Sequence, residues 1–281
     1  MLEYKGYIKS SDGLKLFYRN WLPENESKGQ IFLIHGYSEH SGRYHSWAEK
    51  FISEGFEVYA LDLRGHGHSE GRRGHTPSYS QMLDDIKKFI KNFKSKDKIP
   101  AILYGQSMGG NLVLNYSISV GNGIDGIIAT SPWLKLSKEP KSFIVLFVRI
   151  LRKIFPGLIR KAGFDINCLS HDKKVIEEYN KDPFTHQKIS YNLFFVVRKA
   201  GVYAIEHAQE IEVPTLLMHG TKDMVTSYGA SREFTYNANA AGKDIQFISW
   251  KGLYHELHHE REKEKVFATI KRWLKSKFKD L

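Results

Sequence analysis

The chain has 281 residues, enough for one large α/β domain or two small ones, and an apolar fraction of 41% allows a sizeable core. The formal net charge of +11 suggests a nucleic-acid partner, but no nucleic-acid-binding motif accompanies the basic residues, so we expect none. The N-terminus lacks the apolar segment of a secretion signal. Because Cys168 is the single cysteine, an internal disulfide is excluded, and we expect Cys168 to be a buried structural thiol. Together these features predict a cytoplasmic protein.

Strand and helix patterns alternate along most of the chain. A hairpin with Asp12-Gly13 in its turn opens the sequence. The predicted elements that follow are a strand at 30–35, a helix at 43–54, a strand at 56–61, a helix at 76–93, strands at 100–104, 126–130, 214–220 and 245–250, and a last helix whose apolar face runs from 266 to 278. Alternation of this kind predicts a mostly parallel central sheet flanked by helices.

The alternation stops between position 131 and about position 190. An insertion of this length is too long for a plain loop, so we predict a helical cap inserted between two core strands. The expected division is a core at 1–131, a cap at 132–190 and a second part of the core at 191–281. Within the cap, 143–155 reads as a basic amphipathic helix that is too short and too charged to cross a bilayer. From Lys135 to Lys161 there are eight cations and one acid.

The segment Gly105-Gln106-Ser107-Met108-Gly109 has the pattern G-x-S-x-G. It follows an apolar strand and precedes a helical pattern, the context in which such a serine is held on a sharp turn with its hydroxyl above the sheet. A pattern this short also occurs by chance. A nucleophilic serine of this kind is accompanied by an acid and then a histidine further along the chain, each on a loop after a strand.

Asp223 and His255 meet that requirement, since each follows a predicted strand and their order is correct. The carboxyl ends of parallel strands meet at one edge of a sheet, so we expect Ser107, Asp223 and His255 to form a nucleophile, acid and base set. Other candidates fit less well. His258 and His259 are expected at the start of the last helix, Asp244 precedes its strand, and Asp182 is read as a turn cap.

We expect no metal and no organic cofactor. Histidines are clustered at His66, His68 and His75 and again at His255, His258 and His259, but no cysteine or carboxylate set completes a tetrahedral site.

Several segments, in the same order, resemble the monoacylglycerol lipases and related lysophospholipase-like serine hydrolases of the α/β-hydrolase fold. They are His35-Gly36-Tyr37-Ser38-Glu39-His40-Ser41-Gly42-Arg43-Tyr44, Asp62-Leu63-Arg64-Gly65-His66-Gly67-His68-Ser69, the segment around Ser107, Asp182-Pro183, His219-Gly220-Thr221-Lys222-Asp223 and Tyr254-His255-Glu256-Leu257-His258. The resemblance spans nearly the whole chain.

The resemblance implies an oxyanion hole made by the backbone N–H groups of Tyr37 and Met108, with His35 as a brace for its loop. Relatives often have a smaller residue at the position of Tyr37. The family's cap binds an acyl chain and touches membranes, which places Phe143, Phe147 and Ile150 against substrate and the basic cap against anionic lipid.

The implied function is cleavage of monoacylglycerols or similar single-chain lipid esters through an acyl-enzyme. A lysophospholipase, a thioesterase or a short-chain carboxylesterase with the same triad is the alternative, and a non-catalytic lipid-binding protein is a remote one. The sequence leaves acyl-chain length, regiospecificity and oligomeric state open.

Overall fold

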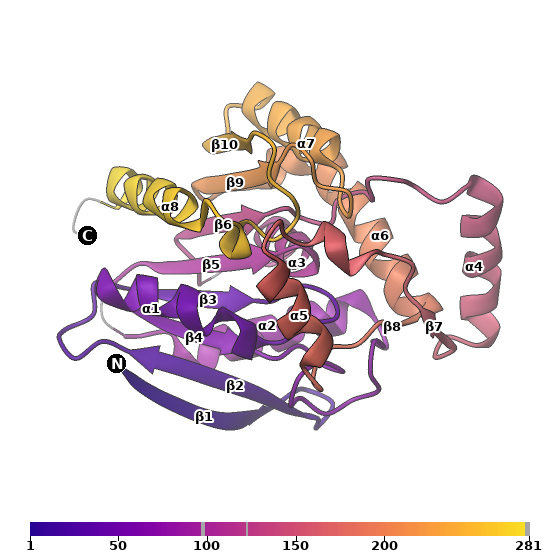
Figure 1. The fold of residues 1–281 in the computed structure, drawn as a ribbon, viewed down its shortest axis with the longest axis horizontal. Helices are drawn as coiled ribbons and strands as arrows, with labels where there is room; N and C mark the ends of the chain where they lie inside the picture. The colour runs from indigo at the N-terminus through magenta and orange to yellow at the C-terminus, as the bar shows by residue number, and fades with distance from the viewer. Residues whose placement is uncertain (97–98, 122, 279–281) are drawn as a thin grey trace.

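A central sheet of eight strands organises the protein (Figure 1). The computed structural model describes residues 1–96, 99–121 and 123–278. The strands lie in the order β1-β2-β4-β3-β5-β6-β9-β10; β1 and β2 are antiparallel to their neighbours and the remaining pairs are parallel. Their bounds are Leu2–Lys9, Lys15–Leu22, Phe56–Leu61, Gly29–Ile34, Ala101–Gln106, Gly126–Thr130, Thr215–Gly220 and Ile245–Trp250 in that spatial order.

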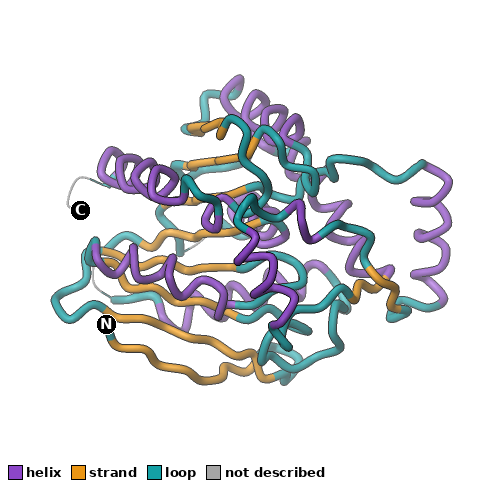
Figure 2. Tube along the Cα trace, in the orientation of Figure 1, coloured by secondary structure: helices purple, strands orange, loops and turns teal. Residues whose placement is uncertain are grey.

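Helices cover both faces of the sheet (Figures 1 and 2). Helices α1 and α8 pack on one face, and α2, α3, α6 and α7 on the other. Their bounds are His45–Ser53 (α1), Lys263–Lys277 (α8), Tyr79–Phe93 (α2), Met108–Ser119 (α3), Tyr191–Glu206 (α6) and Tyr228–Ala240 (α7). With both faces covered, the central strands β3, β5 and β6 are buried along their whole length, as their continuous apolar runs require.

The architecture confirms the predicted α/β fold and most of the predicted elements. The helix predicted at 76–93 begins at Tyr79, because Pro77 precedes Ser78 and the Ser78 hydroxyl caps the helix by accepting from the Gln81 N–H. The predicted apolar stripe of α2, from Met82 to Ile90, is buried against the sheet.

Two expectations about single residues are wrong. His258 and His259 lie in a separate 3₁₀ helix, Leu257–His259, whereas the last helix α8 begins only at Lys263. The His259 ring contacts the Arg43 side chain and backbone carbonyl, which holds this turn against the 3₁₀ turn Ser41–Tyr44 that precedes α1. Cys168 is partly exposed and not buried, because it lies in a 3₁₀ turn, Ile166–Cys168, within the segment after β6.

The segment after β6 contains more than helices. It holds α4 (Ser142–Ile154), α5 (Lys173–Lys181) and a two-stranded antiparallel sheet of β7 (Ile159–Lys161) and β8 (Lys188–Ser190). Helix α4 lies at the edge of the molecule and packs along α6 (Figure 1). Helix α5 contacts the loop after β3, where Tyr179 is hydrogen-bonded to Ser38.

The aromatic packing between α1, the sheet and α8 allows a stability test. Phe51 is fully buried and its ring contacts those of Trp47, Phe56, Tyr104 and Phe267. We predict that Phe51→Ala lowers the free energy of unfolding by about 3–5 kcal/mol in denaturant titrations, because a cavity opens in the core.

Phe143, on α4, is the matched control. Its side chain is 67% exposed, so Phe143→Ala is expected to change the free energy of unfolding by at most about 0.5 kcal/mol. Equal losses in the two variants would contradict the packing described for Phe51.

Candidate active site

The backbone at Ser107 is strained in the way the G-x-S-x-G pattern predicts. Ser107 lies between β5 and α3 with φ of 54°, in the left-handed region that favours glycine. A Cβ on Gly105 would lie 2.4 Å from the Gly109 carbonyl oxygen, and one on Gly109 would lie 2.0 Å from that of Ile34. Only glycine fits at both positions, so this turn brings α3 against β3 and leaves Ser107 at the carboxyl edge of the sheet.

The side chains of Asp223 and His255 are hydrogen-bonded to each other at the same edge. The His255 Nδ1 lies 2.7 Å from the Asp223 Oδ2, and Asp223 Oδ1 accepts from the N–H groups of Val225 and Thr226. Burial alone would raise the pKa of Asp223, but the charge of His255 and a hydrogen bond from His219 outweigh it and hold that pKa far below its usual range. Burial alone would lower the pKa of His255, but the Asp223 carboxylate leaves it raised.

Hydrogen bonds to two backbone carbonyls help to bring the three predicted residues to one end of the sheet. The Ser107 N–H donates to the Thr130 carbonyl (2.9 Å), and the Gln106 side chain donates to the His255 carbonyl (3.1 Å). The nucleophile turn is thereby tied to β6 on one side and to the His255 loop on the other. Ser107 is 7% exposed, Asp223 9% and His255 3%, so the set is screened from bulk water.

The loop after β3 lies directly against the serine. A Cβ on Gly36 would lie 3.2 Å from the Ser107 Cβ, and the Gly36 N–H donates to Glu39 Oε1 (2.6 Å). His35 braces this loop, since its Nε2 accepts from the Leu63 N–H (2.9 Å). Met108 is the first residue of α3, where helical geometry leaves a backbone N–H without an intrahelical partner. The oxyanion role of Tyr37 and Met108 stays a prediction.

A buried charge network connects the Gly36 loop to the His255 loop. Arg43 donates to Glu39 Oε2 (2.7 Å) and, through two nitrogens, to both carboxylate oxygens of Glu256 (2.7 Å each). Burial alone would raise the pKa of Glu256, but the Arg43 guanidinium and His259 hold it well below its usual range. Because Glu256 directly follows His255, Arg43 links the position of the base to that of Gly36.

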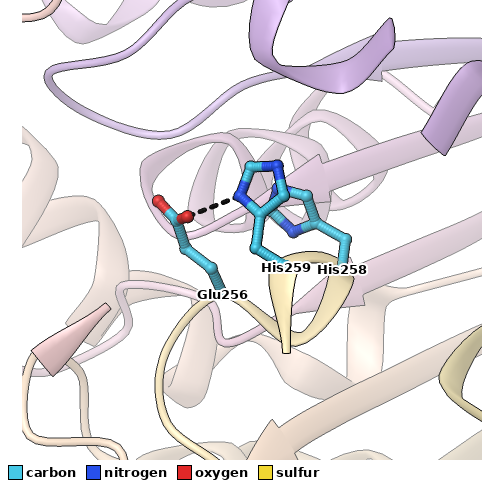
Figure 3. Close-up of side chains that lie close together, drawn as sticks. All are labelled: Glu256, His258 and His259. Carbon is cyan, nitrogen blue, oxygen red and sulfur yellow. Dashed lines mark hydrogen bonds and ion pairs between the residues drawn. The ribbon is translucent and has the colours of Figure 1, made fainter. Parts of the chain in front are cut away.

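Glu256, His258 and His259 place three metal-ligand atoms within 4.8 Å of one another, as Figure 3 shows. The chemistry of this group argues against a cation. The Glu256 carboxylate is held by Arg43, His259 Nδ1 lies 2.6 Å from that carboxylate, and His259 Nε2 lies 3.1 Å from the Arg43 carbonyl. A metal ion here would face the positive charge of Arg43 and would have to displace these bonds.

The other candidates have structural partners. Asp182 caps the end of α5, accepts from the Phe184 N–H and pairs with His40 (2.8 Å), and Asp244 pairs with Lys277. The motif pattern does not predict His219 as a partner of Asp223, yet its Nε2 lies 3.1 Å from Asp223 Oδ2. The His-x-x-x-Asp spacing at the end of β9 could have indicated this contact.

Phe143, Phe147 and Ile150, predicted to bind substrate, are 67%, 57% and 52% exposed on α4. They share one side of the helix with Leu146 and Ile154, while Val148 is buried. Their role in substrate binding stays a prediction.

The family described as serine aminopeptidase, S33, matches residues 25–262. A monoacylglycerol lipase of Mycolicibacterium smegmatis is 30% identical over 267 residues, 94% of each chain. The crystal structure of a Paleococcus ferrophilus monoacylglycerol lipase superposes with a TM-score of 0.83 at 32% identity and covers 98% of this chain and 99% of that one. An uncharacterized abhydrolase domain-containing protein of Dictyostelium discoideum is 32% identical over 97% of this chain, which spans 29% of that protein.

The chain therefore belongs to this α/β-hydrolase family. Its similarity to monoacylglycerol lipases over nearly its whole length makes it a carboxylic ester hydrolase.

The Arg43 network provides a second stability test. We predict that Arg43→Met lowers the free energy of unfolding by about 3–5 kcal/mol, because it leaves the Glu39 and Glu256 carboxylates buried without their partner. Arg43→Lys is expected to lose less, since an ammonium keeps the charge but cannot make the two-nitrogen contact. Denaturant titration measures both values.

The control is Lys50→Met. Lys50 pairs with Glu264 through two contacts of 2.6 and 2.7 Å, but Glu264 is 68% exposed, so we expect a change of at most about 1 kcal/mol. A loss at Arg43 no larger than at Lys50 would refute the structural role assigned to the network.

Proposed function

We propose that this protein is a serine hydrolase that cleaves monoacylglycerols or similar single-chain lipid esters through an acyl-enzyme. The observation that carries the proposal is the strained, glycine-flanked turn at Ser107, set at the same sheet edge as the buried Asp223–His255 pair. The similarity to monoacylglycerol lipases over nearly the whole chain supports the substrate class.

In the proposed reaction, the Ser107 hydroxyl attacks the ester carbonyl carbon while His255 accepts its proton. Asp223 stabilises the imidazolium that forms and keeps Nδ1 as a donor, so that Nε2 faces the serine. The tetrahedral intermediate collapses as the alcohol leaves with the proton from His255. Water then attacks the acyl-enzyme, again with His255 as base, and the fatty acid is released.

The backbone N–H groups of Tyr37 and Met108 are proposed as the oxyanion hole. The position of the Gly36 loop against Ser107 and the start of α3 at Met108 support this assignment. A hole of two such donors contributes several kcal/mol to the transition state, with about 3–4 kcal/mol lost when one donor is removed.

The surface of α4 supports contact with lipid. Its exposed apolar side chains, Phe143, Leu146, Phe147, Ile150 and Ile154, lie beside the exposed cations Arg149 and Lys153. Arg152, in contrast, stacks on Phe195 of α6 at 4.0 Å. No helix in the described part of the chain combines the length and apolar character needed to cross a bilayer. We therefore propose a cytoplasmic enzyme that touches anionic membranes peripherally through this surface.

The activity is tested with a fluorophosphonate probe and a substrate panel. We predict that the probe labels Ser107, that Ser107→Ala abolishes labelling and ester hydrolysis, and that 1-monoacylglycerols are turned over. Ser119→Ala, at the far end of α3, serves as the control that keeps both. A wild-type protein that the probe fails to label would favour a lipid-binding function instead.

A lysophospholipase is the second candidate, because the eight cations from Lys135 to Lys161 suit a phosphate-bearing head group. Faster hydrolysis of lysophosphatidylcholine than of 1-monoacylglycerol would select it. Activity restricted to acetyl and butyryl esters would instead indicate a short-chain carboxylesterase.

Membrane contact is tested by vesicle co-sedimentation. With phosphatidylglycerol-containing vesicles, the double variant Arg149→Gln/Lys153→Gln is expected to bind about 30-fold more weakly, since each cation near an anionic surface contributes about 1 kcal/mol. Lys265→Gln/Lys275→Gln, on exposed positions of α8, removes the same charge and is expected to bind like the wild type. Equal weakening by the two pairs would mean that only net charge matters.

A further inference from the structure

The acid of the proposed triad faces two imidazole rings. Asp223 Oδ2 lies 2.7 Å from His255 Nδ1 and 3.1 Å from His219 Nε2. His219 lies in β9, one residue before the end of the strand, and its side chain is fully buried. Both rings approach the same carboxylate oxygen, so His219 occupies a place in the site to which the serine, acid and base set gives no role.

The Asp223 carboxylate is saturated with hydrogen-bond donors. Its Oδ1 accepts from the backbone N–H groups of Val225 (2.7 Å) and Thr226 (2.9 Å), and its Oδ2 faces the two rings. A carboxylate offers about four lone-pair sites, and these four donors fill them. The Thr226 hydroxyl is close to Oδ2, but it also reaches the Ser131 carbonyl (3.1 Å), to which it donates in this arrangement.

The contacts of His219 fix where its proton lies. An unprotonated Nε2 would set its lone pair against those of Asp223 Oδ2, so Nε2 carries the proton and donates to the carboxylate. On the other side of the ring, Nδ1 lies 2.8 Å from the hydroxyl of Ser231, which is in the first turn of α7. The Nδ1 of a neutral His219 accepts from that hydroxyl, and Ser231 therefore holds the ring in this tautomer.

His219 acts as a neutral donor and not as a second cation. In the proposed reaction His255 takes up a proton, and Asp223 stabilises the imidazolium that forms. A proton on His219 as well would place two buried positive charges on one carboxylate, and buried charges are costly unless they are fully paired. Asp223 can therefore balance the cation on His255 only while His219 stays neutral.

The bond from His219 weakens the hold of Asp223 on the His255 proton. Burial alone would raise the pKa of Asp223, the charge of His255 lowers it, and the hydrogen bond from His219 lowers it further. A hydrogen bond to the charged form of a carboxylate makes that carboxylate less basic. Asp223 therefore stabilises a cation on His255 less than a carboxylate bonded to His255 alone would.

We propose that His219 is a positioning residue, which holds Asp223 Oδ2 in place for His255 and takes up part of the charge of the carboxylate. His255 then becomes a neutral base at a lower pH than it would beside a carboxylate that it did not share. The inference rests on the proposed serine hydrolase mechanism. Through Ser231, the first turn of α7 becomes part of the support of the catalytic base.

The other titratable groups around these side chains are held by partners of their own. They are Glu39, Glu256 and His258 near His255, Cys168 near Asp223, and Tyr228 beside His219. Arg43 holds both glutamates, and the Tyr228 hydroxyl is hydrogen-bonded to Ser249. A change in pH dependence on replacing His219 therefore reports on its bond to Asp223.

The test is the pH profile of kcat/KM for p-nitrophenyl octanoate. The base must be neutral to accept the serine proton, so kcat/KM rises with pH through the pKa of His255 in the free enzyme. We predict that His219→Leu moves this acid limb up by about 0.5–1 pH unit, which lowers kcat/KM about three- to tenfold on the limb relative to the variant's own plateau. His219→Gln keeps an N–H donor at the position of Nε2 and is expected to restore the wild-type limb.

Two further variants complete the series. Ser231→Ala leaves His219 in place but removes the hydroxyl that fixes its tautomer, so we expect a smaller shift in the same direction. His75→Leu is the matched control, because it breaks a histidine–serine contact of the same kind, 2.9 Å from His75 Nδ1 to the Ser190 hydroxyl, that does not involve Asp223. It should keep the wild-type acid limb.

The outcomes separate this inference from the proposed function. An acid limb at the same pH in the wild type and in His219→Leu overturns the inference, and so does a shift that His219→Gln shares, since altered packing would then be its cause. An NMR titration of His255 in the wild type and in His219→Leu measures the same shift without catalysis. A wild-type protein that neither hydrolyses the ester nor reacts with the fluorophosphonate would refute the proposed function, while the NMR titration would still decide the role of His219.

Discussion

The close approach of α3 to the sheet at Ser107 is the constraint on which the rest of the site depends. Glycines at 105 and 109 let the chain turn within van der Waals distance of the Ile34 carbonyl, and the serine between them accepts a left-handed backbone. Such strain persists only where the surroundings hold it in place. Here the buried strands β3, β5 and β6 do so, through bonds such as that from Ser107 to Thr130.

A second constraint is the buried charge network around Arg43. Its two carboxylate partners belong to loops more than 200 residues apart in sequence, Glu39 beside the Gly36 turn and Glu256 beside His255. Ionic groups removed from water are costly unless they are fully paired, so each partner restricts the others to one arrangement. The network therefore sets the distance between the loop that faces the serine and the loop that carries the base.

The segment after β6 combines two different chemistries. On its outer side, α4 exposes an apolar stripe with cations beside it, which suits a lipid surface. On its inner side, the rings of His186 and Phe164 pack against the Tyr37 ring. In the proposed function, the serine turn specifies which bond is broken, whereas the surface of α4 specifies where the substrate comes from.

The sequence by itself determined the order of strands and helices along the chain, the sharp turn at Ser107, and the positions of Asp223 and His255 after their strands. These features follow from periodicity and turn chemistry, which act within a few residues. It did not determine that His258 and His259 leave the last helix, that Cys168 is partly exposed, or that His219 also contacts Asp223. The links from Arg43 to Glu256 and from His66 to His186 join segments more than 100 residues apart. Only the tertiary structure decided these contacts, because which distant side chains meet depends on how the whole chain packs.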